Sequence, residues 1–247
     1  MNMKIIRFVF KPKSALVLPF AHFQVLQGLV YKMLAENPSL SEEVHNKKYD
    51  GTKPFKFFCF TDINGRYRIN GRTLLYSNCF SWEIRSADLR IIDAIRSYVL
   101  HNRCLEIEHT QCAVVSLEVV EKHFFDNKLS VVMNTPAVIC ETDETGFTVY
   151  HSPFERTFIE RITSNIINKY SAFYDESPEN GIRISSVAPK EKNKCVTRYK
   201  STIITAWYGE FVIEADSKVI EFVYHTGIGS KNSMGFGTVA EKLTGIK

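Results

Sequence analysis

The chain has 247 residues, of which 45% are hydrophobic and 23% charged, with a formal net charge of +4 at pH 7. This composition is typical of a folded globular protein and excludes a disordered one, and the length permits one large domain or two smaller ones. No apolar run in the sequence reaches the length of a membrane span. The mild basic excess is compatible with nucleic-acid binding but does not require it.

The N-terminal sequence MNMKIIRFVFKPK is apolar over a short stretch and lacks a small-residue cleavage site. It predicts a first strand and not a secretory signal. The six cysteines show neither CxxC pairs nor the Cys/His spacing of a metal site. We therefore expect free or buried thiols in a reducing cytoplasm, and no metal or other cofactor.

The first half of the chain alternates between strand and helix patterns. Two Asn-Gly dipeptides between β-type runs give the strongest local hairpin signal in the sequence. Apolar residues at spacings of three and four mark two helices, the first ending at Pro38 and the second capped by Ser86. The expected elements are a strand over 3–10, a helix over 21–37, a strand over 55–63, a hairpin over 64–85, a helix over 86–102 and one long or two short strands over 104–122.

The second half repeats this order of elements. Ser152 and Glu155 have the spacing of a capping box, with Pro153 at the first helical position. The expected elements are a strand over 128–140, a helix over 152–170, two strands turning near Tyr208 and Gly209, a short helix over 216–226 that ends in glycines, and a last strand over 236–243.

Strand, helix, strand, strand, helix, strand is the order of the ferredoxin-like fold. We therefore predict an α+β protein of two tandem ferredoxin-like domains, residues 1–122 and 123–247, joined near residues 121–128. The fold is common among RNA-binding proteins, although no RNP-like aromatic motif supports binding on the sheet face.

One loop near the C-terminus, GIGSKNSMGFG at residues 227–237, holds four of the 12 glycines. Neither GxxxxGK[ST] nor GxGxxG occurs there in the required order of strand, loop and helix. Part of the glycine content fits a helix end and a tight turn. The rest predicts a backbone that approaches phosphate closely, with Lys231 adding charge. The expected RNA contacts in this loop are Gly227, Gly229, Lys231, Asn232, Ser233, Gly235 and Gly237.

The order Gly-x-Gly-x-Lys-Asn-Ser-x-Gly-Phe-Gly resembles the C-terminal signature of the RAMP superfamily of CRISPR-associated proteins. Specifically, it resembles the sixth Cas family, and the segments LQGLVYKML, the Val-His at 44–45 and KFFCFTDI follow in the family's order. The resemblance implies a metal-independent endoribonuclease that cuts CRISPR repeat RNA into guide units. It also implies other Cas proteins as partners, and a homodimer is possible in this family.

Cleavage of this kind needs a base for the 2′-hydroxyl, an acid for the leaving oxygen and a cation for the phosphate charge. The resemblance implies His45 for proton transfer, Lys56 as the cation, and Tyr31 as a group that hydrogen-bonds the phosphate or the 2′-hydroxyl. His45 lies in a polar, Lys-rich stretch that we expect to be a loop, and histidine titrates near neutrality. The choice of lysine stays open among Lys56 and three others, and His22 could line the same site. The three other lysines are Lys47, Lys48 and Lys53.

Cations gather before a strand of the second half, where a charged surface loop and an RNA track are both possible. This basic segment comprises Lys190, Lys192, Lys194, Arg198 and Lys200, with Arg183 nearby, and Arg66, Arg68 and Arg72 on the Asn-Gly hairpin form a second candidate. The main alternative function is a non-catalytic RAMP subunit that holds repeat or guide RNA. A small-molecule enzyme lacks support, because the sequence shows no cofactor motif.

Overall fold

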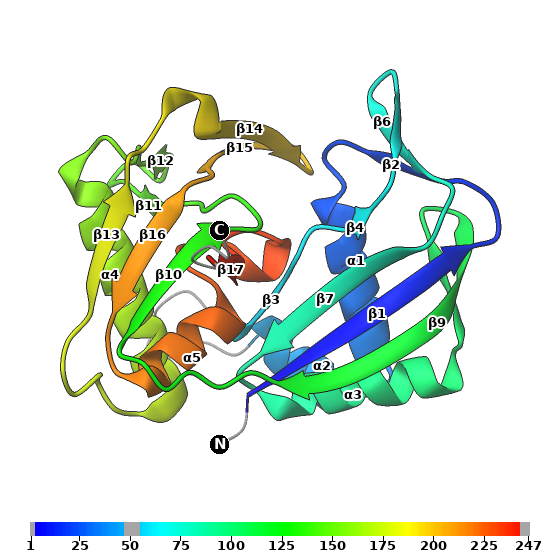
Figure 1. Cartoon of the computed structure of the whole chain (residues 1–247), viewed down its shortest axis with the longest axis horizontal. Helices are drawn as coiled ribbons and strands as arrows, with labels where there is room; N and C mark the ends of the chain where they lie inside the picture. Colours follow the sequence, from blue (N-terminus) through cyan, green and yellow to red (C-terminus); the bar gives the residue numbers. More distant parts are fainter. Residues whose placement is uncertain (1–2, 47–54, 243–247) are drawn as a thin grey trace, which may run out of the picture.

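The computed structural model describes residues 3–46 and 55–242 as an α+β protein with two halves (Figure 1). Within these ranges, no helix is both long and apolar enough to span a membrane. The elements of the first half are β1 (Lys4–Pro12), β2 (Leu16–Pro19), α1 (Phe23–Leu34), α2 (Pro38–Asn46), β3 (Phe58–Phe60), β4 (Asn64–Gly65), β5 (Arg68–Asn70), β6 (Thr73–Tyr76), β7 (Phe80–Ser86), α3 (Leu89–His101), β8 (Cys104–Ile107) and β9 (Thr110–Glu121).

The first half is built on an antiparallel sheet with the strand order β3-β7-β1-β9-β8. Residues of β1 alternate between the two faces of this sheet, as the period of two requires. Ile6, Phe8 and Phe10 are buried in a core with α1 and α3, whereas Arg7 is exposed. The helices lie behind the sheet in Figure 1, and the face that carries Arg7 is left open toward the second half.

The second half is built on a four-stranded sheet with the order β13-β16-β10-β17, in which all pairs are antiparallel. The relative order is that of β3-β7-β1-β9 in the first half. Apolar residues of α4 and α5 form one buried cluster with β10 and β16. The elements are β10 (Lys128–Met133), β11 (Cys140–Thr142), β12 (Thr148–Tyr150), α4 (Arg156–Tyr174), β13 (Arg183–Val187), η1 (Glu191–Asn193), β14 (Lys194–Tyr199), β15 (Thr202–Trp207), β16 (Glu210–Glu214), α5 (Ser217–Thr226), η2 (Asn232–Met234) and β17 (Val239–Glu241).

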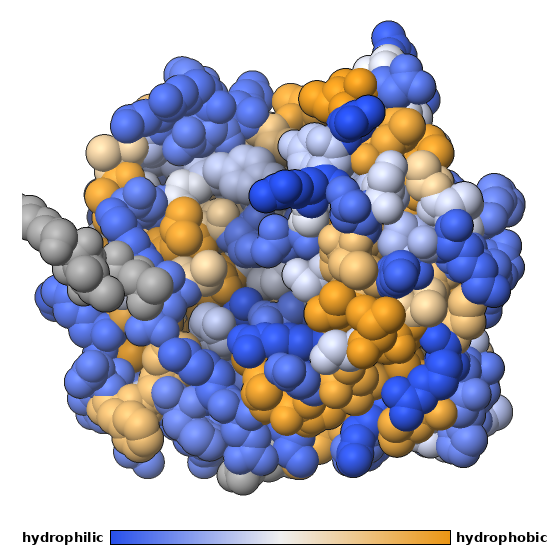
Figure 2. Space-filling model, turned by 45° about the vertical axis from the view of Figure 1, so that its right-hand side comes forward, coloured by the Kyte–Doolittle hydropathy of each residue, from blue (hydrophilic) through white to orange (hydrophobic). Residues whose placement is uncertain are grey.

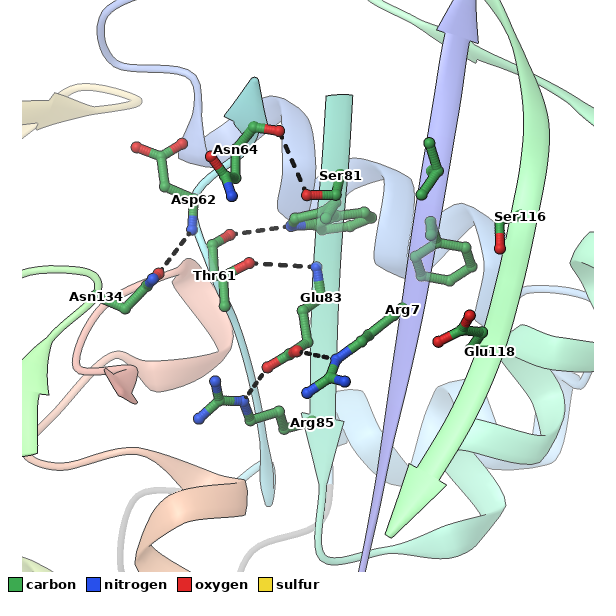
Figure 3. A pocket seen from close by; sticks show the side chains of 13 residues that line it. Arg7, Thr61, Asp62, Asn64, Ser81, Glu83, Arg85, Ser116, Glu118 and Asn134 are labelled. Carbon is green, nitrogen blue, oxygen red and sulfur yellow. Dashed lines mark hydrogen bonds and ion pairs between the residues drawn. The ribbon is translucent and has the colours of Figure 1, made fainter. Parts of the chain in front are cut away.

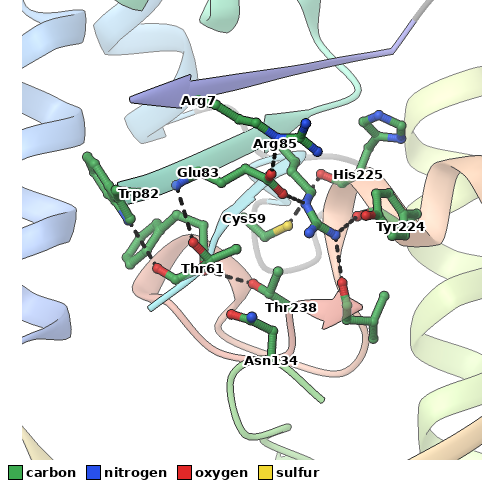
Figure 4. A network of polar contacts seen from close by, with 12 residues as sticks. Arg7, Cys59, Thr61, Trp82, Glu83, Arg85, Asn134, Tyr224, His225 and Thr238 are labelled. Atoms are coloured by element: carbon green, nitrogen blue, oxygen red, sulfur yellow. Dashed lines mark hydrogen bonds and ion pairs between the residues drawn. The ribbon is translucent and has the colours of Figure 1, made fainter. Parts of the chain in front are cut away.

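The two halves share part of their core. Met3, Ile5, Phe57 and Ala87 belong to the first half by sequence, yet they lie in the buried cluster of the second. Arg85 of β7, which is 4% exposed, adds a polar connection across the boundary (Figure 4).

The guanidinium of Arg85 donates to the carbonyl oxygens of Tyr224 (3.2 Å) and Val239 (2.7 Å) and lies 4.0 Å from the ring centre of Tyr224. A buried guanidinium is costly unless its N–H groups are paired, and two of the acceptors of Arg85 belong to the second half. A change in the relative position of the halves would break these bonds, so they favour one arrangement.

Several expected element ends are wrong. Helix α3 is capped by Asp88, whose carboxylate accepts from the N–H of Arg90, while Ser86 still belongs to β7. The capping box at Ser152 does not form, since α4 begins at Arg156 and no side chain caps it.

The strand expected over 128–140 ends at Met133 and resumes only as β11. The two strands around Tyr208 exist, but β15 pairs with β14 and β16 pairs with β10 and β13.

Candidate functional site

A cavity of about 470 Å³ lies where the segment before β3 meets α4 and the glycine loop, residues 227–237. It joins residues that are far apart in the sequence and belong to both halves. Its polar lining residues are Lys56 from the first half, Asn165 and Lys169 from α4, Thr226 from α5, and Ser230, Lys231, Asn232 and Ser233 from the glycine loop.

Tyr31 of α1 and Lys56 are brought together beside this cavity. The ammonium of Lys56 donates to the Tyr31 hydroxyl at 2.8 Å and lies 5.2 Å from the centre of the tyrosine ring. Burial raises the pKa of Tyr31 to about 12, so its hydroxyl is neutral at physiological pH. Burial also lowers the pKa of Lys56. Two of the three predicted catalytic side chains therefore form one hydrogen-bonded pair.

His45 lies in helix α2 and not in the expected loop, which is a correction to the sequence interpretation. Pro38, which we took as the end of α1, instead begins this second helix, because proline suits the first helical position. Glu43 and Val44, the two residues before His45, line a small pocket together with Lys56. The backbone thus brings α2 to the segment of Lys56. The alternative lysines Lys47, Lys48 and Lys53 lie outside the described residues.

The glycines of the loop are explained first by packing. Gly227 ends α5, and the four glycines of the loop all have positive φ and are buried. A Cβ at Gly237 would stand 2.0 Å from the carbonyl oxygen of Ile228, and one at Gly229 would stand 2.6 Å from that of Val138. Side chains are therefore excluded at both positions. Gly235 is likewise closely packed, against Phe60.

The centre of the loop, Ser230–Met234, is half-buried and lines the cavity. Among the residues that the structure describes, the backbone N–H groups of Lys231, Asn232 and Ser233 donate to no partner. By contrast, the N–H groups of Gly227, Gly235 and Gly237 donate to carbonyls of the protein. An anion that meets this loop would therefore find free backbone donors at its centre and not at Gly227, Gly235 or Gly237.

The amide of Asn232 is fully engaged inside the protein. Its Nδ2 donates to the carbonyls of Ile228 (2.9 Å) and Phe236 (3.0 Å), and its Oδ1 accepts from Lys169 (3.0 Å). Asn232 thus connects the two arms of the loop, while Lys231 and Ser233 remain half-exposed beside it.

The basic segment lies on the hairpin of β14 and β15 and the turn before it. Two contacts join this hairpin to α1: the Tyr199 hydroxyl bonds Gln27, and the N–H of Lys200 donates to Gln24 at 3.2 Å. Gln27 in turn donates to the carbonyl of Ser233 in the glycine loop at 2.7 Å. Hairpin, α1 and glycine loop are therefore linked. The cations that are exposed here are Lys190, Lys192, Lys194, Arg198 and Lys200.

A second cavity, of about 320 Å³, lies on the open sheet face between the halves (Figure 3). In Figure 2 the surface is hollowed there, and hydrophilic residues line the hollow. Both arginines inside are already paired, since the Glu83 carboxylate accepts from Arg7 (2.6 Å) and from Arg85. This cavity and the first one lie at opposite ends of β3, because Thr61 lines one and Phe58 the other.

His22 does not join Tyr31 and Lys56. It is 3% exposed, and its Nε2 lies 2.6 Å from the carboxylate of Asp62. Burial opposes protonation, but the hydrogen bond and charge of Asp62 outweigh it and raise the pKa of His22. His225 is also enclosed, and burial lowers its pKa to about 4, so it is neutral. Both histidines are therefore buried residues that lie apart from the pair of Tyr31 and Lys56.

The family of the chain is decided by a profile match. The family described as "CRISPR associated protein Cas6, C-terminal" matches residues 119–241. The chain belongs to the Cas6 family. Its relatives include "CRISPR-associated endoribonuclease Cas6 2" of Methanocaldococcus jannaschii, which is 27% identical over 237 residues, covering 87% of this chain and 89% of the relative. The "CRISPR-associated endoribonuclease Cas6" of Pyrococcus furiosus is 27% identical over 249 residues, covering 98% and 90%.

Solved structures of Cas6 and RAMP proteins share the fold. The structure titled "Characterization of a Cas6-related gene from Pyrococcus furiosus" has a TM-score of 0.82 at 18% identity, covering 98% of this chain and 99% of that one. A structure titled "An RAMP protein binding different RNA substrates" also gives 0.82, at 20% identity and 98% and 100% coverage.

Lys169 and Asn165 are lining residues of this Cas6 chain that the sequence interpretation missed. A signal for Lys169 exists, because it continues the apolar face of α4 set by Phe158, Ile162 and Ile166. Among the described residues, no group of three His, Cys, Asp or Glu side chains could hold a metal ion.

Proposed function

We propose that this chain is a metal-independent endoribonuclease that cuts CRISPR repeat RNA into guide units. The single observation that carries the proposal is the hydrogen-bonded pair of Tyr31 and Lys56 beside a cavity walled by the glycine loop. The curated relatives named as CRISPR-associated endoribonucleases support it, since they match this chain over most of its length.

We further propose that each half is a ferredoxin-like domain, with residues 1–122 and 123–247 as the units. In support, each half offers the order strand, helix, strand, strand, helix, strand, with insertions between them. Both main sheets also place the first of these strands between the third and the fourth. That arrangement is the antiparallel sheet expected of a βαββαβ unit.

In the proposed reaction the 2′-oxygen forms a bond to the adjacent phosphorus while the bond from phosphorus to the 5′-oxygen breaks. His45 takes the 2′ proton, and a protonated group returns one proton to the 5′-oxygen. The products are a 2′,3′-cyclic phosphate and a 5′-hydroxyl. His45 is assigned to this step because of its position in the sequence, shortly after α1, which resembles that of the histidine in the Cas6 family.

Lys56 is well suited to stabilise the charge that develops on the phosphate. Its ammonium makes one hydrogen bond, to Tyr31, among the described residues, and two N–H groups remain for a ligand. Tyr31 would contribute as a neutral phenol that hydrogen-bonds a substrate oxygen, because its pKa of about 12 disfavours the phenolate.

For RNA binding we propose two surfaces. The first is the centre of the glycine loop, where Lys231 and Ser233 adjoin unpaired backbone N–H groups. The glycines at Gly227, Gly229, Gly235 and Gly237 act by shaping this loop. The second is the basic segment on the hairpin that contacts α1 and on the turn before it, with Lys190, Lys192, Lys194 and Arg198. Other Cas proteins and a second copy of the chain are candidate partners.

The test compares wild type and His45→Ala on a labelled CRISPR repeat RNA in EDTA, with a second RNA that carries one 2′-deoxy nucleotide at the cut site. We expect one cut by the wild type in EDTA, and no cut on the deoxy RNA or by His45→Ala. Tight binding by the wild type without any cut would instead indicate a non-catalytic RNA-binding RAMP subunit. Cleavage of the deoxy RNA would overturn the 2′-hydroxyl mechanism.

A further inference from the structure

Lys169 of α4 is a buried lysine whose donors are all used within the protein. Its side chain is 3% exposed. The ammonium donates to the carbonyl oxygens of Gly227 at 2.6 Å and Thr226 at 3.3 Å, and to Oδ1 of Asn232 at 3.0 Å. An ammonium has three N–H groups, so none is left for a substrate. Lys169 therefore borders the cavity without being able to bind what enters it.

Two of these acceptors lie where α5 passes into the glycine loop, and the third, Asn232, lies at the centre of the loop. Thr226 and Gly227 end the helix, where carbonyl groups lack intrahelical partners and carry partial negative charge. Asn232 then passes the connection on, since its Nδ2 holds the carbonyls of Ile228 and Phe236. One ammonium thus fixes the start of the loop directly and both of its arms through one amide.

The charge of Lys169 is not neutralised by a carboxylate, because none lies within ion-pair distance among the described residues. The titratable group that acts on it is the Cys59 thiol of β3, whose pKa is raised by burial. Lys56 and Lys231 face the same cavity. Burial lowers the pKa of Lys169 itself to about 7, so the loop rests on a group that can lose its proton near neutrality.

We propose that Lys169 is a positioning residue for RNA binding: through Asn232 it holds the centre of the glycine loop in the shape that receives a phosphate of the RNA. The inference rests on the proposed function but adds a residue that never touches the RNA. It accounts for a buried lysine that has no carboxylate partner among the described residues. If packing of α4 were the only requirement, an apolar side chain would suit this position better.

The test uses Lys169→Met, Asn232→Ala and the double variant, with Lys218→Met as the matched control. Lys218 lies at the opposite end of α5 and pairs with Glu176 on the surface. Affinity is measured on the 2′-deoxy repeat RNA, and cleavage in single turnover at saturating RNA. We expect about tenfold weaker binding for each single variant, comparable to one lost buried hydrogen-bond group. The maximal cleavage rate stays within about threefold of wild type.

The double variant decides whether Lys169 acts through Asn232. If it does, the double variant binds no more weakly than either single one, because the second substitution removes nothing further. If the affinity losses of the two single variants multiply in the double variant, Lys169 does not act through Asn232. Equal binding by Lys169→Met and wild type overturns the proposal entirely.

Two further readouts separate positioning from mere stability. Wild-type affinity should fall as pH rises through about 7, when Lys169 loses its proton, whereas Lys169→Arg should show no such step. Hydrogen exchange at the N–H groups of Gly235 and Gly237 should accelerate in Lys169→Met and Asn232→Ala relative to Lys218→Met. This second readout needs no RNA, so it tests Lys169 even if the wild type proves unable to bind or cut.

Discussion

Two lysines border the same cavity and differ in what they can do there. Lys56 is half-buried and makes one hydrogen bond within the described residues, to Tyr31. Lys169 is almost fully buried and makes three, all to the protein. The count of unused donors separates them: Lys56 can stabilise charge on a ligand, and Lys169 can only stabilise the wall that the ligand meets. Proximity to a cavity therefore does not by itself identify a catalytic lysine.

The largest effect that tests this difference is expected for Lys56→Met. Loss of the ammonium should slow single-turnover cleavage by about 10²–10³-fold, the usual result of removing one donor to a developing negative charge. Affinity for the 2′-deoxy RNA should change by less than about threefold. If Lys56→Met instead weakened binding and spared the cleavage rate, the contrast with Lys169 would be lost. Lys218→Met again serves as the control for loss of one positive charge.

Gly237→Ala tests whether the backbone of the glycine loop, which Lys169 holds, can adopt another conformation. The added Cβ would stand 2.0 Å from the carbonyl oxygen of Ile228, at a φ of +79°. We expect the free energy of unfolding in urea to fall by about 3 kcal/mol, from strain and steric clash together. Gly181→Ala is the control, since Gly181 has a φ of +69° with nothing within 4 Å. A loss of about 1 kcal/mol there would isolate the conformational part.

The pH dependence of stability gives a smaller and more specific signal for Lys169. Below pH 7 the lysine is protonated in both the folded and unfolded states, and its burial cost is fully present. Above pH 7 the folded state releases the proton while the unfolded state keeps it up to about pH 10, so stability rises with pH. The contribution is at most about 1.4 kcal/mol per pH unit. Urea unfolding of wild type and Lys169→Met between pH 7 and 9 should show this slope only in the wild type.

The smallest expected effect concerns the basic segment, which lies outside the cavity. Lys194→Ala and Arg198→Ala should each weaken RNA binding a few-fold and reduce the slope of log K against log salt by about 0.7, as one lost phosphate contact does on single-stranded RNA. Cleavage at saturating RNA should not change. Arg156→Ala, whose guanidinium pairs with Glu160 on the surface, is the matched control. An unchanged salt slope in both Lys194→Ala and Arg198→Ala would remove this segment from the RNA track.

Much of the element order could be predicted because apolar periodicity is local. The face of α1 and the alternation of β1 follow directly from it, and the second Asn-Gly dipeptide does lie at the turn between β5 and β6, where Asn70 ends β5 and Gly71 begins the turn. The geometry of the site was harder to predict from the sequence. Tyr31 and Lys56 were named through resemblance, whereas their hydrogen bond depends on how the chain brings α1 beside the segment before β3.

The features that the sequence did not predict each have a physical cause. Helix α2, with the sequence PSLSEEVHN, has too few apolar residues to show a period, and its opening proline fits either a helix end or a first helical turn. Lys169 follows the apolar face of its helix, because its stem is aliphatic, and only the fold shows acceptors 57 to 63 residues away. Part of the glycine content of the loop was expected from a helix end and a tight turn, and the structure adds close backbone packing at Gly229 and Gly237; phosphate contact by the loop stays a prediction.

The core that the two halves share has a consequence for how the chain arises and persists in a cell. Residues from the first 90 positions complete the interior of the second half, and Arg85 ties the two together. The first half has a core of its own, but four of its apolar residues find their buried partners only in the second half. The nascent first half must therefore keep that apolar surface available until the rest is made. A calorimeter should then record one transition for the whole chain. A truncation at either side of the junction would leave a fragment with exposed apolar surface for chaperones and proteases to act on.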